Sequence, residues 1–425
     1  MKRQIILYLF FFLANVYTKA QINDVYSFLN LHTLQKKNNT VMGFNADAYL
    51  ASNAVKNNLS NAFLYNKFID DKLKSSVSLK NENYYGQKIQ SNFYYSHKYD
   101  TLWGISNMGI KVGVNYQMFK NMSFSKDFYN LVMYGNKQYE GKTADLSNLD
   151  INMLSYQSIE LGFFKYFKEP ANGYHTLYFG FNLIKGQEYQ YLYFQDAKLF
   201  TAPAGEYIDL DIKSGYFGSD SVASNILDFN GIGASLNFYW AYEDEKHKSR
   251  YEVAFTELGL ISWYKNPLNY MADTNIRLEG VEVNNIFSSD EEIAINSKDS
   301  ILKEIYSTEN NKTFLKSLPK QFNFTFSKYL LDNKYIARLG AGYIFNANQM
   351  MPVVYSDNKF FLDPRFNIGI SVAYGGYTGF RIGLSTEFTI KNKFHILLSS
   401  SNIAGFVLDE NTYSQAMFVG LTYCL

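Results

Sequence analysis

Two consecutive runs near the C-terminal end of the chain alternate between apolar and polar residues. The apolar positions are Phe366, Ile368, Ile370 and Val372 in the first run, and Phe380, Ile382, Leu384 and Phe388 in the second, with Gly375-Gly376 between them. The intervening positions are small, polar or charged. A period of two is that of a β-strand, so Pro364–Ile390 predicts a long hairpin with one apolar face.

The same alternation recurs along most of the chain. Strands are predicted at Phe44–Leu50, Lys88–Lys98, Gly109–Gln117, Asn152–Phe167, Tyr174–Ile184, Asp228–Tyr242, Arg250–Trp263, Gln321–Leu330, Tyr335–Phe345, Arg365–Tyr374, Thr378–Ile390, Phe394–Ser400 and Tyr413–Leu425. A weaker pattern at Asn275–Val281 brings the count to about 14 strands. Many of these runs exceed the five or six residues usual in a soluble sheet and are long enough to cross a bilayer.

The predicted connections differ in length. Three are long, at Phe119–Asp150, Gly186–Leu227 and Asn266–Leu318, whereas Asp332-Asn333 and Lys391-Asn392 are hairpin-sized. This mixture is typical of a membrane barrel whose two rims differ. However, the short turns Gly375–Tyr377 and Lys391-Asn392 flank a single strand, which indicates that one strand has been missed or added.

Two connections carry a helical pattern. Apolar residues at helical spacing in Asn58–Lys80 predict a helical turn in or on the mouth of the sheet, and Asn58–Ile69 is a candidate plug. A second helix is expected at Ser300–Tyr306, and a short strand near Tyr207–Ile212, within the long connections.

Two fold classes fit the alternation. A soluble sandwich or propeller would bury its apolar face and turn a charged face to water. Here the non-apolar face is mostly Gly, Ser, Asn and Thr with isolated charges, which suits a crowded barrel interior. We therefore predict an all-β protein, an antiparallel transmembrane β-barrel with small helical loop insertions.

The N-terminus predicts export. Met1–Ala20 has Lys2 and Arg3, an apolar run, and Thr18-x-Ala20 before Gln21, the pattern of a cleaved signal peptide. The alternative is a membrane anchor, but the apolar run is too short to span a bilayer. Residues 21–425 would then form one barrel domain.

Composition narrows the class further. The 37 Tyr and 36 Phe residues suit the aromatic girdles of a barrel. A net charge of +1 gives no electrostatic footprint for nucleic acid. The single cysteine, Cys424, excludes a disulfide within the chain.

A specific segment carries a family resemblance. Glu257–Asn266, ELGLISWYKN, resembles the acidic-Leu-Gly-Phe-Ile-x-Trp-x-Lys-Asn segment of a large family of uncharacterised outer-membrane barrels from Bacteroidota. The signal peptide, Asn402–Gly405 and the ending Phe418–Tyr423 extend the likeness. The chain departs from the aromatic end usual in barrel-assembly signals, because Tyr423 is followed by Cys424-Leu425.

This resemblance implies an outer-membrane location in a Gram-negative, Bacteroidota-like bacterium. The family is similar in architecture to FadL-like lipid-uptake barrels and to PorV-type barrels of secretion systems. Membrane lipid and the barrel-assembly machinery are the partners it implies. No activity is established for the family, so the resemblance implies no catalytic residues.

Charged residues on the polar faces are candidates for the barrel interior, namely Lys111, Glu160, Arg338, Arg365, Arg381 and Glu387. On a lipid-facing surface such an Arg or Lys would cost about 2–4 kcal/mol at the bilayer midplane. We therefore expect them to face the lumen or lie near a rim. They would form either a paired network that fills the barrel or a polar constriction on a solute path.

No pattern indicates a cofactor or a metal. The five histidines lack zinc spacing. Gly231-Ile232-Gly233 and Gly340-Ala341-Gly342 lie within strands, where glycine marks close packing rather than a phosphate loop. Asp290-Glu291-Glu292 lacks the ligand spacing of a calcium loop.

Three functions remain open. The leading hypothesis is a non-enzymatic outer-membrane barrel that passes a small or hydrophobic solute. The second is a scaffold for a secretion or cell-surface assembly. The third is a barrel-embedded hydrolase that would use His395 with Ser399, Ser385 and Glu387.

Overall fold

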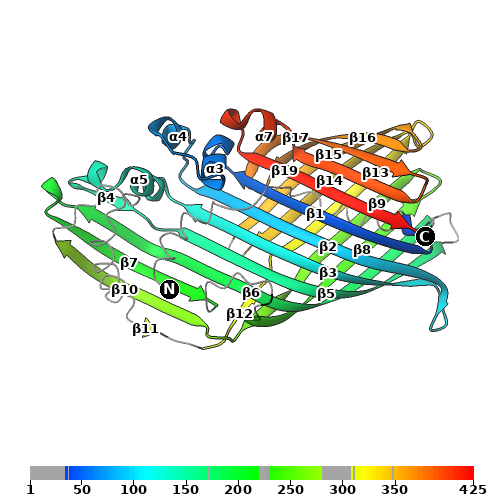
Figure 1. Ribbon diagram of the computed structural model, residues 1–425, viewed down its shortest axis with the longest axis horizontal. Coiled ribbons are helices and arrows are strands. Elements are labelled where there is room, and N and C mark those ends of the chain that lie inside the picture. The colour runs from blue at the N-terminus through cyan, green and yellow to red at the C-terminus, as the bar shows by residue number, and fades with distance from the viewer. Residues whose placement is uncertain are drawn as a thin grey trace.

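The chain's alternating segments form a wall that closes on itself (Figure 1). In this computed structural model, residues 34–36, 38–169, 173–219, 227, 229–279, 308–309, 312–346 and 349–425 are described. The first and last strands, β1 (Thr40–Ser52) and β19 (Ser414–Cys424), pair antiparallel from Val41↔Cys424 to Ala51↔Ser414. This pairing completes a 14-stranded antiparallel barrel, as predicted.

The other wall strands follow in chain order. They are β2 (Asn83–Leu102), β3 (Ile105–Phe124), β5 (Leu149–Glu169), β6 (Gly173–Thr201), β8 (Gly231–Asp244), β9 (Ser249–Trp263), β13 (Lys320–Leu330), β14 (Tyr335–Asn346), β15 (Gln349–Asp363), β16 (Phe366–Gly375), β17 (Thr378–Ile390) and β18 (Phe394–Asn402). Each pairs antiparallel with the next, so the sheet closes on itself and, apart from the β1–β19 closure, every neighbour relation is local in sequence.

The two rims of the barrel differ. At one rim, called here the short-turn rim, six connections of two to four residues join β2–β3, β5–β6, β8–β9, β13–β14, β15–β16 and β17–β18. The opposite, long-loop rim carries the connections 53–82, 125–148, 202–230, 264–319 and 403–413, together with the two-residue links that follow β14 and β16. Adjacent turns of one strand lie on opposite rims, so both short turns that flank β17 are real.

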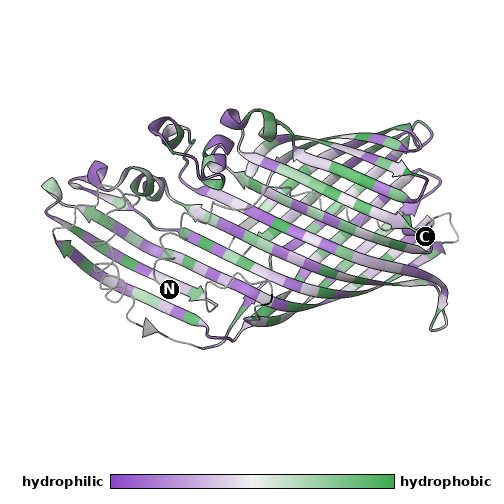
Figure 2. Ribbon diagram, in the orientation of Figure 1, coloured by the Kyte–Doolittle hydropathy of each residue, from purple (hydrophilic) through white to green (hydrophobic). Residues whose placement is uncertain are grey.

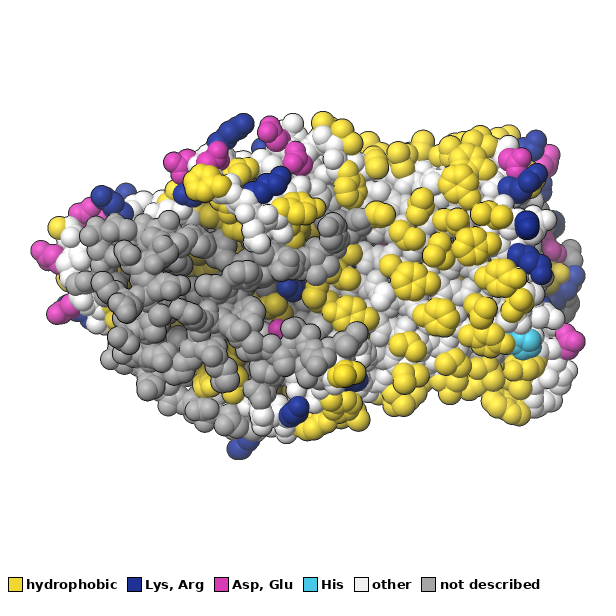
Figure 3. Space-filling view, in the orientation of Figure 1, with side chains coloured by type: hydrophobic (Ala, Val, Ile, Leu, Met, Phe, Trp, Pro, Cys, Tyr) yellow, Lys and Arg dark blue, Asp and Glu magenta, His cyan; other side chains and the backbone are white. Residues whose placement is uncertain are grey.

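Apolar side chains cover the outside of the barrel (Figures 2 and 3). In β16 and β17, Ile370, Val372 and Ile382 are exposed, whereas Asn367, Ser371 and Arg381 between them are buried. This inverts the pattern of a soluble core and matches a lipid-facing wall. None of the described helices is both long and apolar enough to cross a bilayer.

A sheet extends the wall beyond the barrel at the long-loop rim (Figure 1). Strand β6 is 29 residues long; its first part pairs with β8, and its second part, from Gln190, pairs with β7 (Tyr207–Gly218). Strand β10 (Leu268–Glu279) pairs with β7 and with β11 (Thr308–Glu309). Short strands β4 (Lys142–Asp145) and β12 (Phe314–Ser317) pair with β6 and β9.

Helices from the long loops pack on this sheet to form what we call the cap. They are α3 (Asn57–Leu64), α4 (Asp71–Ser75) and α5 (Lys126–Tyr134), while α7 (Ala404–Val407) lies beside β19. Ser125 and Asp70 accept N-cap hydrogen bonds from Phe128 N and Leu73 N. Leu59, Phe63 and Phe128 join Ile151 and Ile212 in one apolar core, so the loops are packed rather than splayed.

Several predictions about the connections were wrong. Strand β15 was missed because its middle, Ser356–Lys359, is a polar run that hides the alternation. Gly186–Leu227 is not a loop, since β6 continues to Thr201 and β7 follows. The weak Asn275–Val281 pattern belongs to β10, which lies outside the barrel wall. The predicted total of 14 strands is therefore correct only because the wrongly included segment, which belongs to β10, compensates for the missed strand β15.

Other predictions fared differently. The long connection predicted at Phe119–Asp150 is shorter in the structure, because β3 runs to Phe124 and β5 begins at Leu149. The helical segment within Asn58–Lys80 is confirmed by α3 and α4. The expected helix Ser300–Tyr306 and the signal peptide Met1–Ala20 lie outside the described residues.

Candidate functional site: a polar belt inside the barrel

A buried ion pair lies at mid-height in the barrel interior. Lys111 on β3 donates from Nζ to Glu160 Oε2 on β5 at 2.6 Å, and their side chains are only 7% and 2% exposed. Glu160 Oε1 also accepts hydrogen bonds from Tyr178 OH and from Asn237 Nδ2, the latter at 3.1 Å. Strand alternation turns all four side chains inward, and the pairing neutralises a charge that would be costly unpaired.

A second carboxylate, Glu257, lies in a wall irregularity. The register between β8 and β9 shifts between Leu236 and Phe238, and Glu257 takes a left-handed conformation with φ +59°. Its backbone N–H donates to Asn237 Oδ1 at 3.0 Å. Such a conformation costs a non-glycine residue about 1–3 kcal/mol. The bulge directs the carboxylate to Gln117 Nε2 at 2.7 Å and Ser235 Oγ at 3.2 Å.

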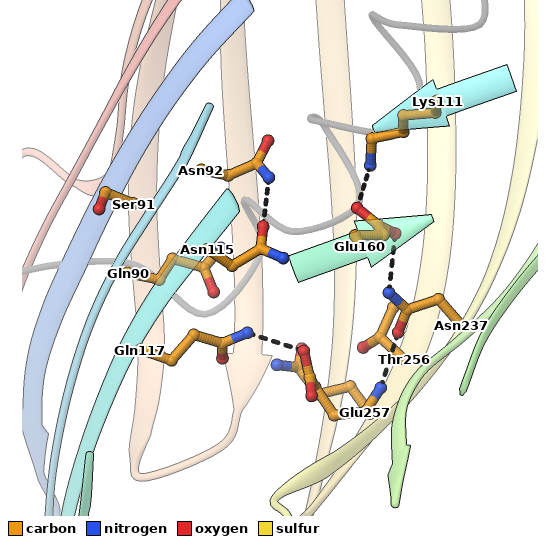
Figure 4. Close-up of a pocket in the computed structure, with 11 residues that line it drawn as sticks. Gln90, Ser91, Asn92, Lys111, Asn115, Gln117, Glu160, Asn237, Thr256 and Glu257 are labelled. Carbon is orange, nitrogen blue, oxygen red and sulfur yellow. Dashed lines mark hydrogen bonds and ion pairs between the residues drawn. The ribbon is translucent and has the colours of Figure 1, made fainter. Parts of the chain in front are cut away.

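These groups surround a small polar cavity of about 70 Å³ (Figure 4). Its lining includes Asn115 and Gln90 as well as the two glutamates, with Asn115 Nδ2 donating to Ser158 Oγ at 3.0 Å. This volume holds several water molecules. We call the groups around this cavity the polar belt.

A further cluster lies between the belt and the short-turn rim. Arg250 Nε donates to Glu252 Oε1 at 3.0 Å, and Arg250 Nη2 donates to Tyr239 OH at 2.7 Å. Tyr239 OH in turn donates to Glu252 Oε1 at 2.5 Å. Arg250 Nη1 also lies 3.6 Å from Glu243 Oε2. The cluster pairs a buried guanidinium with a buried carboxylate through Glu252 Oε1, while Glu252 Oε2 is buried with no hydrogen-bond partner among the described residues.

Two more pairs line the opposite half of the wall. Arg338 on β14 donates from Nη1 to Asp357 Oδ2 on β15 at 2.8 Å. Lys359 Nζ and Asn367 Nδ2 both donate to Glu387 Oε2 at 3.1 Å. The Arg338–Asp357 pair joins neighbouring strands, and the Lys359–Glu387 pair spans β16, so both pairs neutralise interior charges locally along the wall.

Three contacts join distant strands across the interior. Near the short-turn rim, Lys36 Nζ donates to Glu243 Oε2 at 2.6 Å, joining the segment before β1 to β8. At the belt, Gln117 on β3 reaches Glu257 on β9. Near the long-loop rim, Tyr377 OH donates to Asn121 Oδ1 on β3. Each contact joins walls four or five strands apart, so side chains bridge the lumen at three levels.

The six candidate lumen charges take different places. Lys111, Glu160, Arg338 and Glu387 join the pairs above, and Arg381 is buried near the long-loop rim. Arg365 is not a lumen residue. It occupies the turn between β15 and β16, with 72% of its side chain exposed and Asp363 at 3.9 Å, because the strand ends before it.

Sequence reasoning missed half of the ion-pair partners. Asp357 and Lys359 lie on the unpredicted strand β15, and Arg250 and Glu252 lie on β9 without having been singled out. Glu257 stood in the motif that carried the family resemblance, and that was a usable signal. The prediction that glycine within the strands marks close packing is confirmed at Gly340, where a Cβ would overlap the Tyr355 ring.

His395 has neighbours that do not form the expected catalytic set. Its Nδ1 is hydrogen-bonded to Thr389 Oγ1 at 3.0 Å and lies 3.8 Å from Glu387 Oε1. The other carboxylate oxygen of Glu387 already accepts a hydrogen bond from Lys359. A hydrolase needs a serine activated by the imidazole. No cluster of three metal-ligating side chains occurs among the described residues. The arrangement is suited to holding charges in place and to excluding bulk water.

Comparison with known proteins identifies a family and several solved structures of low similarity. The profile of a family of unknown function, DUF5723, matches residues 39–400. No curated protein matches the chain. Among solved structures, the toluene transporter TodX of Pseudomonas putida is similar at 6% identity and TM-score 0.43, over 90% of this chain and 87% of that one.

Two further structures are similar at the same low level. A FadL homologue of Pseudomonas aeruginosa has 7% identity and TM-score 0.38, over 91% of this chain and 89% of that one. The translocator domain of the autotransporter NalP from Neisseria meningitidis has 7% identity and TM-score 0.33, over 95% and 96%. Likeness at this level says nothing about cargo, and the barrel fold rests on the strand pairing itself.

Proposed function

The chain belongs to this family of unknown function, and we propose that it is an integral outer-membrane barrel with a closed interior that anchors and displays its cap. The observation that carries the proposal is the set of three contacts across the lumen. A barrel of 16–18 strands leaves an aqueous channel, and one of eight is filled by its own side chains. The barrel of this protein has 14 strands, and long polar side chains from its wall meet across the lumen.

The closed interior argues against a constitutive diffusion pore. The cavity between Glu160 and Glu257 holds about 70 Å³, too little for a sugar or an amino acid. At the belt, the bridging carboxylate Glu257 accepts hydrogen bonds from Gln117 and Ser235, so opening a path there would take donors from a buried charge. The cap, in contrast, is a packed unit of α3–α5 and the β6 extension, which offers a large surface beyond the bilayer.

Solute flux tests the closed interior. The purified protein, reconstituted into liposomes, should release entrapped glucose no faster than empty liposomes do. The double variant Tyr377→Ala/Gln117→Ala removes two of the three bridging contacts and should raise the release rate if the lumen is closed by them. Rapid release through the unchanged protein would contradict the proposal.

Membrane location has its own test. We propose the outer membrane of a Gram-negative, Bacteroidota-like bacterium, reached through the barrel-assembly machinery. The protein should fractionate with outer membranes and migrate faster on gels before heating than after. A soluble periplasmic pool would contradict this location.

The scaffold role is tested on the cap. A photoreactive residue at Lys213, exposed on β7, should give a crosslinked product of defined mass in cells that express the protein. The same probe at Ile370, on the lipid-facing wall, is the matched control. Equal products at both positions would argue against a specific partner for the cap.

One observation favours a second function, gated passage of a small hydrophobic solute. Above the belt, Tyr189 and Trp263 stack at 5.5 Å, and Phe314 packs on Tyr189 and Phe217 at 5.6 Å. A buried aromatic cluster of this kind supplies apolar ring surface of the sort that lines sites for apolar ligands. Toluene should then change the fluorescence of Trp263, with Trp263→Phe as the control; an unchanged spectrum would remove this candidate.

A further inference from the structure

The barrel wall is incomplete beside β17 at the long-loop rim. The pairing of β17 with β18 runs from Ile390↔Phe394 to Leu384↔Ser400, and one more bond joins Ile403 N to Ile382 O at 3.0 Å. Beyond it, the first residues of β17 lie opposite the connection 403–413 instead of a strand. In this fully described part of the chain, no ladder pairing closes that edge. The wall therefore has a gap, which we call the wall window.

A pocket of about 440 Å³ lies at the wall window. It is lined by Arg381 and Lys80, by the apolar Phe380 and Ile382, and by polar residues of the connection that carries α7. No aspartate or glutamate is among the described residues that line it; Asp409 and Glu410, in the neighbouring turn, do not reach it. The pocket thus carries two positive charges and no negative one.

Arg381 is not neutralised there. It is only 4% exposed, and its Nη1 donates to Gly375 O at 2.6 Å and to Thr378 Oγ1 at 3.4 Å. Its Nη2 is buried with no hydrogen-bond partner among the described residues, and no carboxylate pairs with it. Three other cations on the wall, Lys111, Arg338 and Lys359, each pair with a carboxylate. A buried guanidinium with a vacant donor is suited to an anion, which guanidinium binds with two parallel hydrogen bonds.

The frame of the pocket is held rigidly. Asn57 Nδ2 donates to Ser414 O and Thr412 Oγ1, both at 2.8 Å, which ties α3 to the connection. Asn402 Nδ2 donates to Ser414 Oγ at 2.8 Å, and Gln415 Nε2 donates to Gly405 O at 2.9 Å. A site whose walls are fixed before binding loses little entropy on binding.

The outer side of the pocket is apolar. Phe380 and Ile382 flank Arg381 on β17 and are 66% and 44% exposed on the lipid-facing side of the wall. We propose that the wall window binds the phosphate headgroup of a membrane amphiphile, with Arg381 and Lys80 on the phosphate and the acyl chain along Phe380 and Ile382. Charge alone would suit a free anion, but the adjoining apolar surface favours one that carries an acyl chain. This inference rests on the membrane location proposed above.

Lipid binding to the full-length protein in detergent tests the site. Native mass spectrometry with dilauroyl phosphatidic acid should show binding about tenfold tighter than with dilauroyl phosphatidylcholine, because one charge-assisted interaction is worth about a factor of ten. Arg381→Gln and Lys80→Gln should each remove most of that preference. Lys72→Gln, an equal loss of charge on the nearby α4 outside the pocket, should leave it unchanged.

Further arms separate the outcomes. Arg381→Lys keeps the charge and should keep part of the preference, and faster gel migration before heating identifies the variants that fold. Inorganic phosphate at millimolar concentration should not displace phosphatidic acid; if it does, the site takes a free anion and the proposal fails. Equal binding of the two lipids also overturns it. The proposed outer-membrane location would survive either result, since fractionation and gel migration test it separately.

Discussion

The Lys111–Glu160 pair gives the sharpest test of the polar belt, through the variant Lys111→Met. Glu160 then keeps only two neutral donors among the described residues, Tyr178 and Asn237. Because its side chain is 2% exposed, bulk water does not reach Glu160, and the few waters that the cavity holds replace the lost cation only in part. Breaking one side of a buried ion pair typically costs about 3–5 kcal/mol. We expect the free energy of unfolding to fall by that amount.

The double variant Lys111→Met/Glu160→Gln separates an unpaired charge from lost packing. With both charges gone, the amide introduced at position 160 can still bond to its two neutral neighbours. The loss should shrink to roughly 1 kcal/mol, since neutral replacements of a buried pair are often well tolerated. The coupling energy between the two positions would then be at least about 2–4 kcal/mol, because any cost of Glu160→Gln alone adds to the difference between Lys111→Met and the double variant.

Urea unfolding of the barrel in phospholipid vesicles, followed by tryptophan fluorescence, measures these differences as shifts of the midpoint at constant slope. Lys393→Met, in an exposed turn of the short-turn rim, serves as the control and should change stability by less than about 0.5 kcal/mol. If Lys111→Met costs less than about 1 kcal/mol, or the double variant loses the sum of both single changes, the belt is wetter than the structure indicates and the reasoning is wrong.

Two other predictions concern the upper lumen and the cap. In Gly86→Ala, the new Cβ would lie 2.5 Å from the Tyr377 ring, so this tyrosine must move. We expect the variant to be destabilised by about 1–3 kcal/mol and to release glucose from liposomes faster than the unchanged protein. Unchanged release would show that Tyr377 does not seal the lumen. In the cap, hydrogen bonds from Arg277 at 2.7 and 2.8 Å lower the pKa of Asp209. Because the pKa of this carboxyl is lower in the folded than in the unfolded state, its ion pair stabilises the fold at pH values above the unfolded-state pKa of about 4. This stabilisation is lost as the pH falls through the folded-state pKa. Hydrogen exchange in β7 and β10, corrected for its intrinsic rate, should therefore accelerate below about pH 4; Asp209→Asn should abolish that step, and a step that persists in this variant would assign it elsewhere.

Regular alternation made the wall predictable. In β16 and β17 every second residue is apolar and faces outward, so the hairpin Pro364–Ile390 was placed nearly to the residue. Prediction failed where interior charges interrupt that pattern. In β15, Asp357 pairs with Arg338 of β14 and Lys359 pairs with Glu387 of β17, and these partners make a polar run stable inside a strand.

The cap escaped prediction for a different reason. The second part of β6 alternates less cleanly because both of its faces meet protein or water rather than lipid. Ile212 of β7 and Ile276 of β10 are buried in a core that also contains residues of the loop helices α3 and α5. Such burial depends on segments far apart in the chain, and a local pattern contains no trace of it.

The sequence by itself determined the class of fold: period-two apolar faces can be satisfied only by a sheet, and their length and lipid-like exposure favour a closed membrane barrel. It also identified five charges that the wall turns inward. Only the tertiary structure decided which charges meet, because partners such as Gln117 and Glu257 are 140 residues apart and depend on strand register. The tertiary structure likewise decided that side chains bridge the lumen. It also decided that Arg381, alone among those five charges, has no carboxylate partner and lies beside a gap in the wall. Both features depend on how the sheet closes.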